Sequence, residues 1–167
     1  MSMRSSGPLS DPEFVAGLKP IPTGPADARR ALPAHDIEGV TPQGSRFQLR
    51  VDVLDQLVLL AFLHIKCDGC DAFWRGFADE SGEALPDSVS VVIVTKGPES
   101  IDAAEVIRVA VGIDQYPVVM SDVAWTDYRV LGYPFFVLVD ASSRAIVCET
   151  VGFGWSDVVS MIESARA

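Results

Sequence analysis

Residues 57–80 read LVLLAFLHIKCDGCDAFWRGFADE, an apolar run followed by two cysteines and then by a segment of mixed polarity. All seven residues from Leu57 to Leu63 are apolar, which is typical of a strand buried on both faces of a sheet. Farther on, the apolar residues recur at the spacing of one helix face, at Cys70, Phe73, Trp74 and Phe77. The segment therefore predicts a central strand that leads into an amphipathic helix.

The two cysteines, Cys67 and Cys70, are separated by Asp68 and Gly69 and lie where the predicted strand gives way to the predicted helix. Unpaired backbone N–H groups and the positive end of the helix dipole favour a negative charge at a helix N-terminus. A thiolate is such a charge, and it is the reactive form of cysteine. The position of the pair therefore indicates a redox function.

Length and composition restrict the class of protein. A chain of 167 residues with 49% hydrophobic residues predicts one globular domain with a sizeable core. The net charge of −10 disfavours nucleic-acid binding, and no apolar stretch approaches the roughly 18–20 residues that span a membrane. There are three cysteines, and the N-terminus has no apolar segment typical of a signal peptide, so a cytoplasmic location is expected.

The remaining chain divides into an arm and a domain. Residues 1–33 hold six of the eleven prolines and show no helical or strand period, which predicts a flexible arm. In residues 34–167, strands are expected at 47–51, 88–95, 118–120, 135–140 and 145–151, and further helices at 99–111, at 122–131 and after Gly154. This order predicts an α/β fold with a mixed sheet of about five strands and helices on both faces.

Three features of the sequence belong together: the apolar strand before the cysteine pair, an apolar strand ending at Asp140, and the spaced residues Tyr128, Val130, Gly132 and Pro134. In these features the chain resembles the thioredoxin-like superfamily, and within it the TlpA-type thiol-disulfide oxidoreductases. The resemblance covers about residues 34–167 and implies a thioredoxin-like fold. It also implies that Pro134 is a cis proline beside the cysteine pair.

The resemblance implies roles for individual residues. Cys67 would attack a substrate disulfide, and Cys70 would resolve the mixed disulfide. The backbone of Tyr133 and Pro134 would hold a substrate segment. The partners would be a disulfide-containing protein and an electron-donor thiol system, with no cofactor, no metal, no nucleic acid and no membrane.

The site departs from the family pattern in several residues. Asp68 and Gly69 replace the proline-containing pairs that are usual between the cysteines, and Lys66 replaces a tryptophan. Asp68 is expected to disfavour a thiolate at Cys67, whereas Lys66 is expected to favour it. Ala61 stands where plain thioredoxins have a buried carboxylate that assists proton transfer.

Other interpretations remain open. One alternative is a redox-inactive pair, in which case the protein would be a thioredoxin-like binding module that holds a partner at the groove of Tyr133 and Pro134. Alternatively, His64 with the two cysteines forms an H-x-x-C-x-x-C run of three metal ligands, whereas a structural zinc site normally has four. The third cysteine, Cys148, lies in an apolar strand and is interpreted as a packing residue.

Overall fold

The computed structural model describes residues 32–79, 85–152 and 154–167. Its elements are, in chain order, β1 (Ile37–Val40), β2 (Arg46–Leu49), the short 3-10 helix η3 (Val51–Val53), β3 (Leu57–Phe62), α2 (Asp68–Ala78), β4 (Val89–Thr95), α3 (Ala103–Val109), β5 (Val118–Met120), α4 (Asp122–Asp127), β6 (Phe135–Asp140), β7 (Ala145–Val151) and α5 (Trp155–Arg166). The predicted central strand and the helix after it correspond to β3 and α2.

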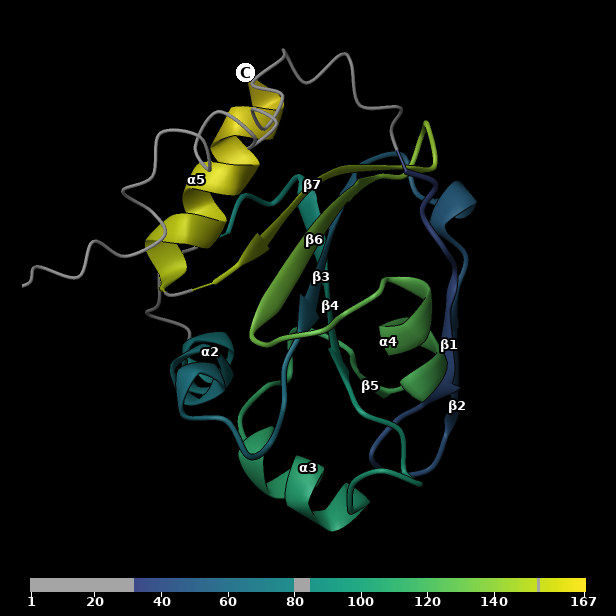
Figure 1. The fold of residues 1–167 in the computed structure, drawn as a ribbon, viewed down its shortest axis with the longest axis vertical. Helices are drawn as coiled ribbons and strands as arrows, with labels where there is room; N and C mark the ends of the chain where they lie inside the picture. The colour runs from purple at the N-terminus through teal and green to yellow at the C-terminus, as the bar shows by residue number, and fades with distance from the viewer. Residues whose placement is uncertain (1–31, 80–84, 153) are drawn as a thin grey trace, which may run out of the picture. The chain divides into compact units, whose positions relative to one another are not determined.

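All the strands belong to one sheet of seven, in the order β2-β1-β5-β4-β3-β6-β7 (Figure 1). The three inner strands β5, β4 and β3 run parallel, and the strands on both sides of them pair antiparallel. The predicted mixed sheet is confirmed, but it has seven strands rather than about five. The strand without a sequence signal is β1, because it has four residues and includes Gly39.

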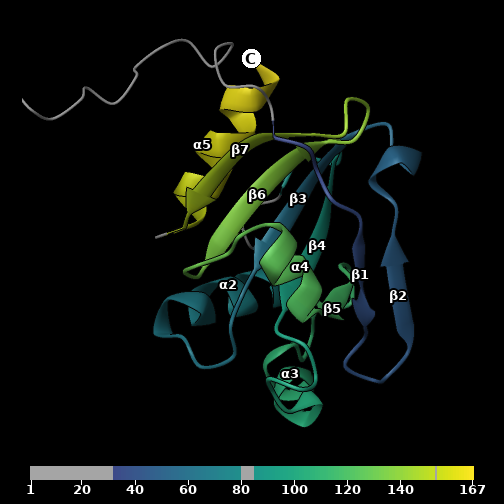
Figure 2. The same cartoon turned by 45° about the vertical axis from the view of Figure 1, so that its right-hand side comes forward.

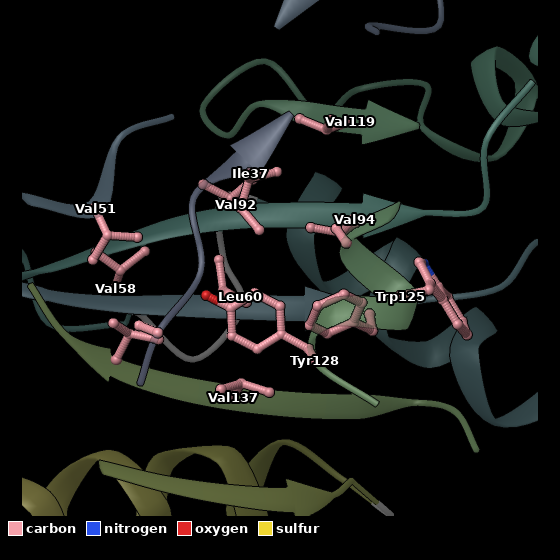
Figure 3. Close-up of a cluster of buried hydrophobic side chains, with 14 of the residues drawn as sticks. Ile37, Val51, Val58, Leu60, Val92, Val94, Val119, Trp125, Tyr128 and Val137 are labelled. Atoms are coloured by element: carbon pink, nitrogen blue, oxygen red, sulfur yellow. The ribbon is translucent and has the colours of Figure 1, made fainter. Parts of the chain in front are cut away.

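Helices cover both faces of the sheet, as predicted (Figures 1 and 2). One face carries a cluster of buried side chains to which α4 contributes. Figure 3 shows this cluster, with Trp125 at one end of it, beyond Val94. The other face carries a cluster built on α2 and α5. Since β3 supplies alternate residues to both clusters, its apolar run is explained by burial on both faces.

Two predicted helices are shorter in the structure. The helix expected over 99–111 is α3, which begins after Asp102, whose side chain accepts the N–H of Ala104 at 2.9 Å. The apolar residues of this stretch predict an inward face of Ala103, Ile107 and Ala110. The buried residue is instead Val106, and Ile107 is 42% exposed. The helix expected over 122–131 is α4, which stops before Arg129, where φ is +53° and a regular helix cannot continue.

The predicted edge strand 47–51 is β2, which ends at Leu49 because Val51 turns into η3 and is buried there. Of the predicted arm 1–33, residues 1–31 lie outside the described residues. Leu32 and Pro33 are described: the Leu32 carbonyl accepts the N–H of Ile146 at 2.8 Å, and Pro33 forms a bridge with Ala145. No helix in the described part of the chain is long and apolar enough to cross a membrane.

Candidate redox site

Cys67 lies between β3 and α2 as the N-cap residue of α2. Its backbone is extended, with φ −147° and ψ 113°, and its Sγ accepts the N–H of Cys70 at 3.2 Å. An N-cap side chain meets backbone N–H groups that have no partner within the helix, and the helix dipole adds positive potential there. The Cys67 sulfur therefore lies at the start of α2, where its sequence position places it.

Cys70 differs from Cys67 in both burial and partners. Its side chain is 0% exposed, and its Sγ accepts the backbone N–H of His64 at 3.4 Å. Burial raises the pKa of the Cys70 thiol, and the hydrogen bond with Cys67 raises it further. Both cysteines are free thiols in the structure, so the pair is an accessible sulfur at the helix cap and a buried protonated thiol behind it.

The peptide bond between Tyr133 and Pro134 is cis, as the resemblance implied. Pro134 borders the start of α2: a Cβ built on Gly69 would lie 3.4 Å from Pro134 Cδ. The carbonyl of Tyr133 lies 3.9 Å from Cys67 Sγ, whereas that of Pro134 already accepts the N–H of Gly152 at 3.1 Å. The backbone that faces Cys67 is thus that of Tyr133, and its role in holding a substrate stays a prediction.

An aromatic group adjoins this loop. The His64 ring stacks on Tyr133 with centroids 4.7 Å apart, and Trp125 meets Tyr133 edge-on at 5.7 Å. Lys96 Nζ lies 4.6 Å from the centre of the Trp125 ring. Sequence reasoning did not find Lys96, although it follows β4, the parallel neighbour of β3. The carboxyl ends of parallel strands meet at one edge of a sheet, and that rule was the available signal.

Lys66 and Asp68, the residues predicted to tune Cys67, are both exposed. The Lys66 backbone N–H donates to Nδ1 of His64 at 3.0 Å, and its side chain borders a hollow lined by Ile65, Lys66, Glu105, Arg108 and Val109. Burial, followed by the charges of Lys96 and Lys66, lowers the pKa of His64. Both lysines therefore act on His64, and the effect of Lys66 and Asp68 on Cys67 stays a prediction.

No carboxylate is buried in the described part of the chain, where the buried polar residues are Thr95 and Ser121. Ala61 is fully buried in the cluster that contains Cys70, so the position at which the resemblance would place a carboxylate is apolar here. Asp79 is exposed, and Glu80 lies outside the described residues. A proton that leaves Cys70 therefore has no buried carboxylate acceptor among the described residues.

The two remaining interpretations from the sequence concern metal and Cys148. No group of three or more His, Cys, Asp or Glu side chains that could hold a metal ion occurs within the described ranges. Cys148 is half-buried in β7, and its Sγ donates to the carbonyl of Met161 at 3.9 Å. Burial raises the pKa of Cys148, which keeps it a thiol in a packing position.

No protein-family model and no curated protein matches the sequence. Solved structures do match in fold. A putative thiol:disulfide interchange protein DsbE from Chlorobium tepidum is 19% identical, with a TM-score of 0.63 over 82% of this chain and 97% of that one. A secreted Mycobacterium tuberculosis disulfide oxidoreductase homologous to E. coli DsbE is 16% identical, with a TM-score of 0.58 over 77% and 95%. A thiol:disulfide interchange protein from Bacteroides sp. is 18% identical, with a TM-score of 0.56 over 80% and 88%. These structural neighbours are thioredoxin-like, and the predicted thioredoxin-like fold is confirmed.

Proposed function

We propose that this protein is a thiol-disulfide oxidoreductase that uses Cys67 and Cys70 to reduce, or exchange, protein disulfides. The observation that carries the proposal is the asymmetry of the pair. Cys67 is partly exposed and accepts a hydrogen bond from the start of α2, whereas Cys70 is buried and holds its proton. A nucleophile that faces substrate and a resolving thiol behind it are what two-step disulfide exchange requires.

The reaction begins when the Cys67 thiolate attacks one sulfur of a substrate disulfide. The S–S bond of the substrate breaks, a mixed disulfide forms on Cys67, and the other substrate sulfur leaves as a thiolate. Cys70 then loses its proton and attacks Cys67 Sγ, which releases the second substrate sulfur. The substrate gains two electrons, the protein gains a Cys67–Cys70 disulfide, and a donor dithiol returns the pair to its reduced form.

A redox titration tests this proposal. The protein is equilibrated across a graded thiol–disulfide series, trapped with a thiol reagent and analysed by mass spectrometry. We expect one two-electron transition confined to Cys67 and Cys70, and the same transition in the matched control Cys148→Ser. A midpoint potential of about −270 mV, as in thioredoxin, would indicate a reductant, and one of about −120 mV, as in DsbA, would indicate an oxidant.

The roles of the two cysteines are tested with single replacements. Cys67→Ser should abolish turnover, and Cys70→Ser should trap the mixed disulfide on Cys67. If no intramolecular disulfide forms at any potential, the oxidoreductase proposal fails. Partner binding that is insensitive to both replacements would then favour a binding module at the groove of Tyr133 and Pro134.

The compartment is part of the proposal. We expect the protein to act in the cytoplasm, where a pair of this kind is more often catalytic than structural. One similar structure is of a secreted protein, so cell fractionation is the direct measurement. Recovery of the protein outside the cytoplasm would reassign its substrates and its electron donor.

A further inference from the structure

Both lysines of the described chain lie at the redox site, although the protein carries a net charge of −10. Lys66 directly precedes Cys67 in the chain. Lys96 reaches the site from β4, with its ammonium over the ring of Trp125, and that ring contacts Tyr133 beside Cys67. The only other lysine, Lys19, lies outside the described residues. In an acidic protein, this placement concentrates positive charge around the reactive sulfur.

The two lysines have different neighbours. Lys96 belongs to the side of Trp125 and Tyr133, whereas Lys66 borders the hollow toward α3, where Arg108 adds a second cation and Glu105 one anion. Both lysines lower the pKa of His64, whose ring stacks on Tyr133. Their fields therefore overlap at the surface where the Tyr133 backbone faces Cys67.

Neither lysine is neutralised by an ion pair within the described residues. The ion pairs there join Arg50 and Arg144 to Asp36 and Asp52. The Asp122 carboxylate lies at the residues that follow Lys96, where it accepts the N–H of Gly97 at 3.1 Å and the hydroxyl of Ser100 at 2.9 Å. Lys96 instead makes a cation–π contact with Trp125, which brings no opposite formal charge to the ammonium.

Negative charge lies on the remaining side of the site. Asp68 and Asp71 occupy the first turn of α2, and both are exposed. A substrate peptide that crosses the site would thus meet cations from Lys96 and Lys66 and anions from α2. Opposite charges on different parts of a binding site orient a charged ligand as well as attracting it.

We propose that Lys96 and Lys66 select substrate disulfides flanked by acidic residues, with a carboxylate of the substrate placed at the Lys96 ammonium over Trp125. This inference rests on the proposed oxidoreductase function and specifies its substrate class as acidic peptide segments. The rest of the protein repels such segments because of its net negative charge, so the two lysines supply the local attraction.

The test uses three peptide disulfides of one sequence, with Glu, Gln or Lys beside the cysteine. The measured quantity is kcat/KM for the reduction of each peptide by the full-length protein. We expect the Glu peptide to exceed the Gln peptide by about 1.5- to 5-fold, the range of one exposed ion pair. The preference should shrink when ionic strength is raised from about 0.05 M to about 1 M.

Variants assign the preference to its residues. Lys96→Gln should reduce the rate with the Glu peptide to that with the Gln peptide, Lys96→Glu should reverse the preference toward the Lys peptide, and Lys96→Arg should retain it. Lys66→Gln should weaken it. Arg46→Gln, on the far edge strand β2, removes the same charge from an exposed site and should leave the preference intact.

The outcomes separate this inference from the function on which it rests. If the Cys67–Cys70 disulfide never forms and none of the peptides is reduced, the proposed function fails. If all three peptides are reduced at equal rates, the function stands and the inference is overturned. Equal losses with all three peptides in Lys96→Gln and Lys96→Arg would make Lys96 a structural residue, which also overturns the inference.

Discussion

Replacing Cys67 with serine or with alanine separates its role at the start of α2 from its chemistry. In the reduced protein, Cys67 Sγ accepts the N–H of Cys70 at 3.2 Å and acts as the N-cap. Serine keeps an acceptor at this position, whereas alanine leaves the N–H without its side-chain partner. Loss of an N-cap acceptor costs about 1 kcal/mol, within a range of about 0.5–2 kcal/mol. We therefore expect Cys67→Ala to be less stable than Cys67→Ser by about 1 kcal/mol.

The assay is urea unfolding of both variants at pH 7 under reducing conditions, followed by circular dichroism. Neither variant can form the Cys67–Cys70 disulfide, so the difference reports the cap alone. In a thermal scan, 1 kcal/mol corresponds to a shift of roughly 2–6 °C in Tm for a domain of this size. Equal stabilities, or a more stable alanine variant, would refute the reasoning that the Cys67 sulfur stabilises the start of α2.

Three further predictions concern other parts of the domain. Gly39→Ala should destabilise the protein by about 1–3 kcal/mol in urea unfolding. The reason is that a Cβ there would overlap the backbone oxygen of Met120 in β5. A Cβ at Gly132 would have no atom within 4 Å, so Gly132→Ala serves as the control. Burial and two nearby lysines lower the pKa of His64 below its ordinary value of 6.5. His64 therefore binds a proton more readily in the unfolded chain than in the folded protein. As pH falls from about 7 to 5, the wild-type protein should lose more stability than His64→Gln. Parallel profiles of unfolding free energy against pH would contradict this. Tyr128→Phe should cost about 1–3 kcal/mol, because the Tyr128 hydroxyl accepts the backbone N–H of His35 at 2.9 Å and donates to its carbonyl at 2.5 Å; unchanged unfolding would show that water replaces it.

The fold could be predicted wherever burial left a clear period in the sequence. β3 and α2 follow the change from a continuous apolar run to helical spacing, and both clusters of buried residues confirm that change. β1 left no such signal, because Ile37 is its one fully buried residue and the pairing with β5 depends on close approach at Gly39. The prediction that Ile107 lies on the inward face of α3 was wrong. The helix has seven residues and makes only two turns, which is too short for periodicity to distinguish Val106 from Ile107.

The site was predictable where its residues are neighbours in the chain and not where tertiary structure brings them together. Cys67 and Cys70 are identified by their spacing and by the elements on either side. The cis bond before Pro134 was expected from the resemblance alone. Lys96 lies 29 residues after Cys67 in the printed sequence, on another strand, and reaches the site only through the face of Trp125. Neither spacing nor period records such a contact.

The different surroundings of the two thiols follow mainly from backbone and burial. Apart from the hydrogen bond between the two sulfurs, the groups that contact them are the N–H of Cys70 on Cys67, the N–H of His64 on Cys70 and the carbonyl of Tyr133 near Cys67. All three are main-chain groups, fixed by the strand, the helix start and the loop before Pro134. The charged side chains of Lys66 and Asp68 are exposed, so solvent screens them. In the proposed reaction, the backbone therefore sets the surroundings of Cys67 and Cys70, and the exposed charges around them act on the choice of substrate.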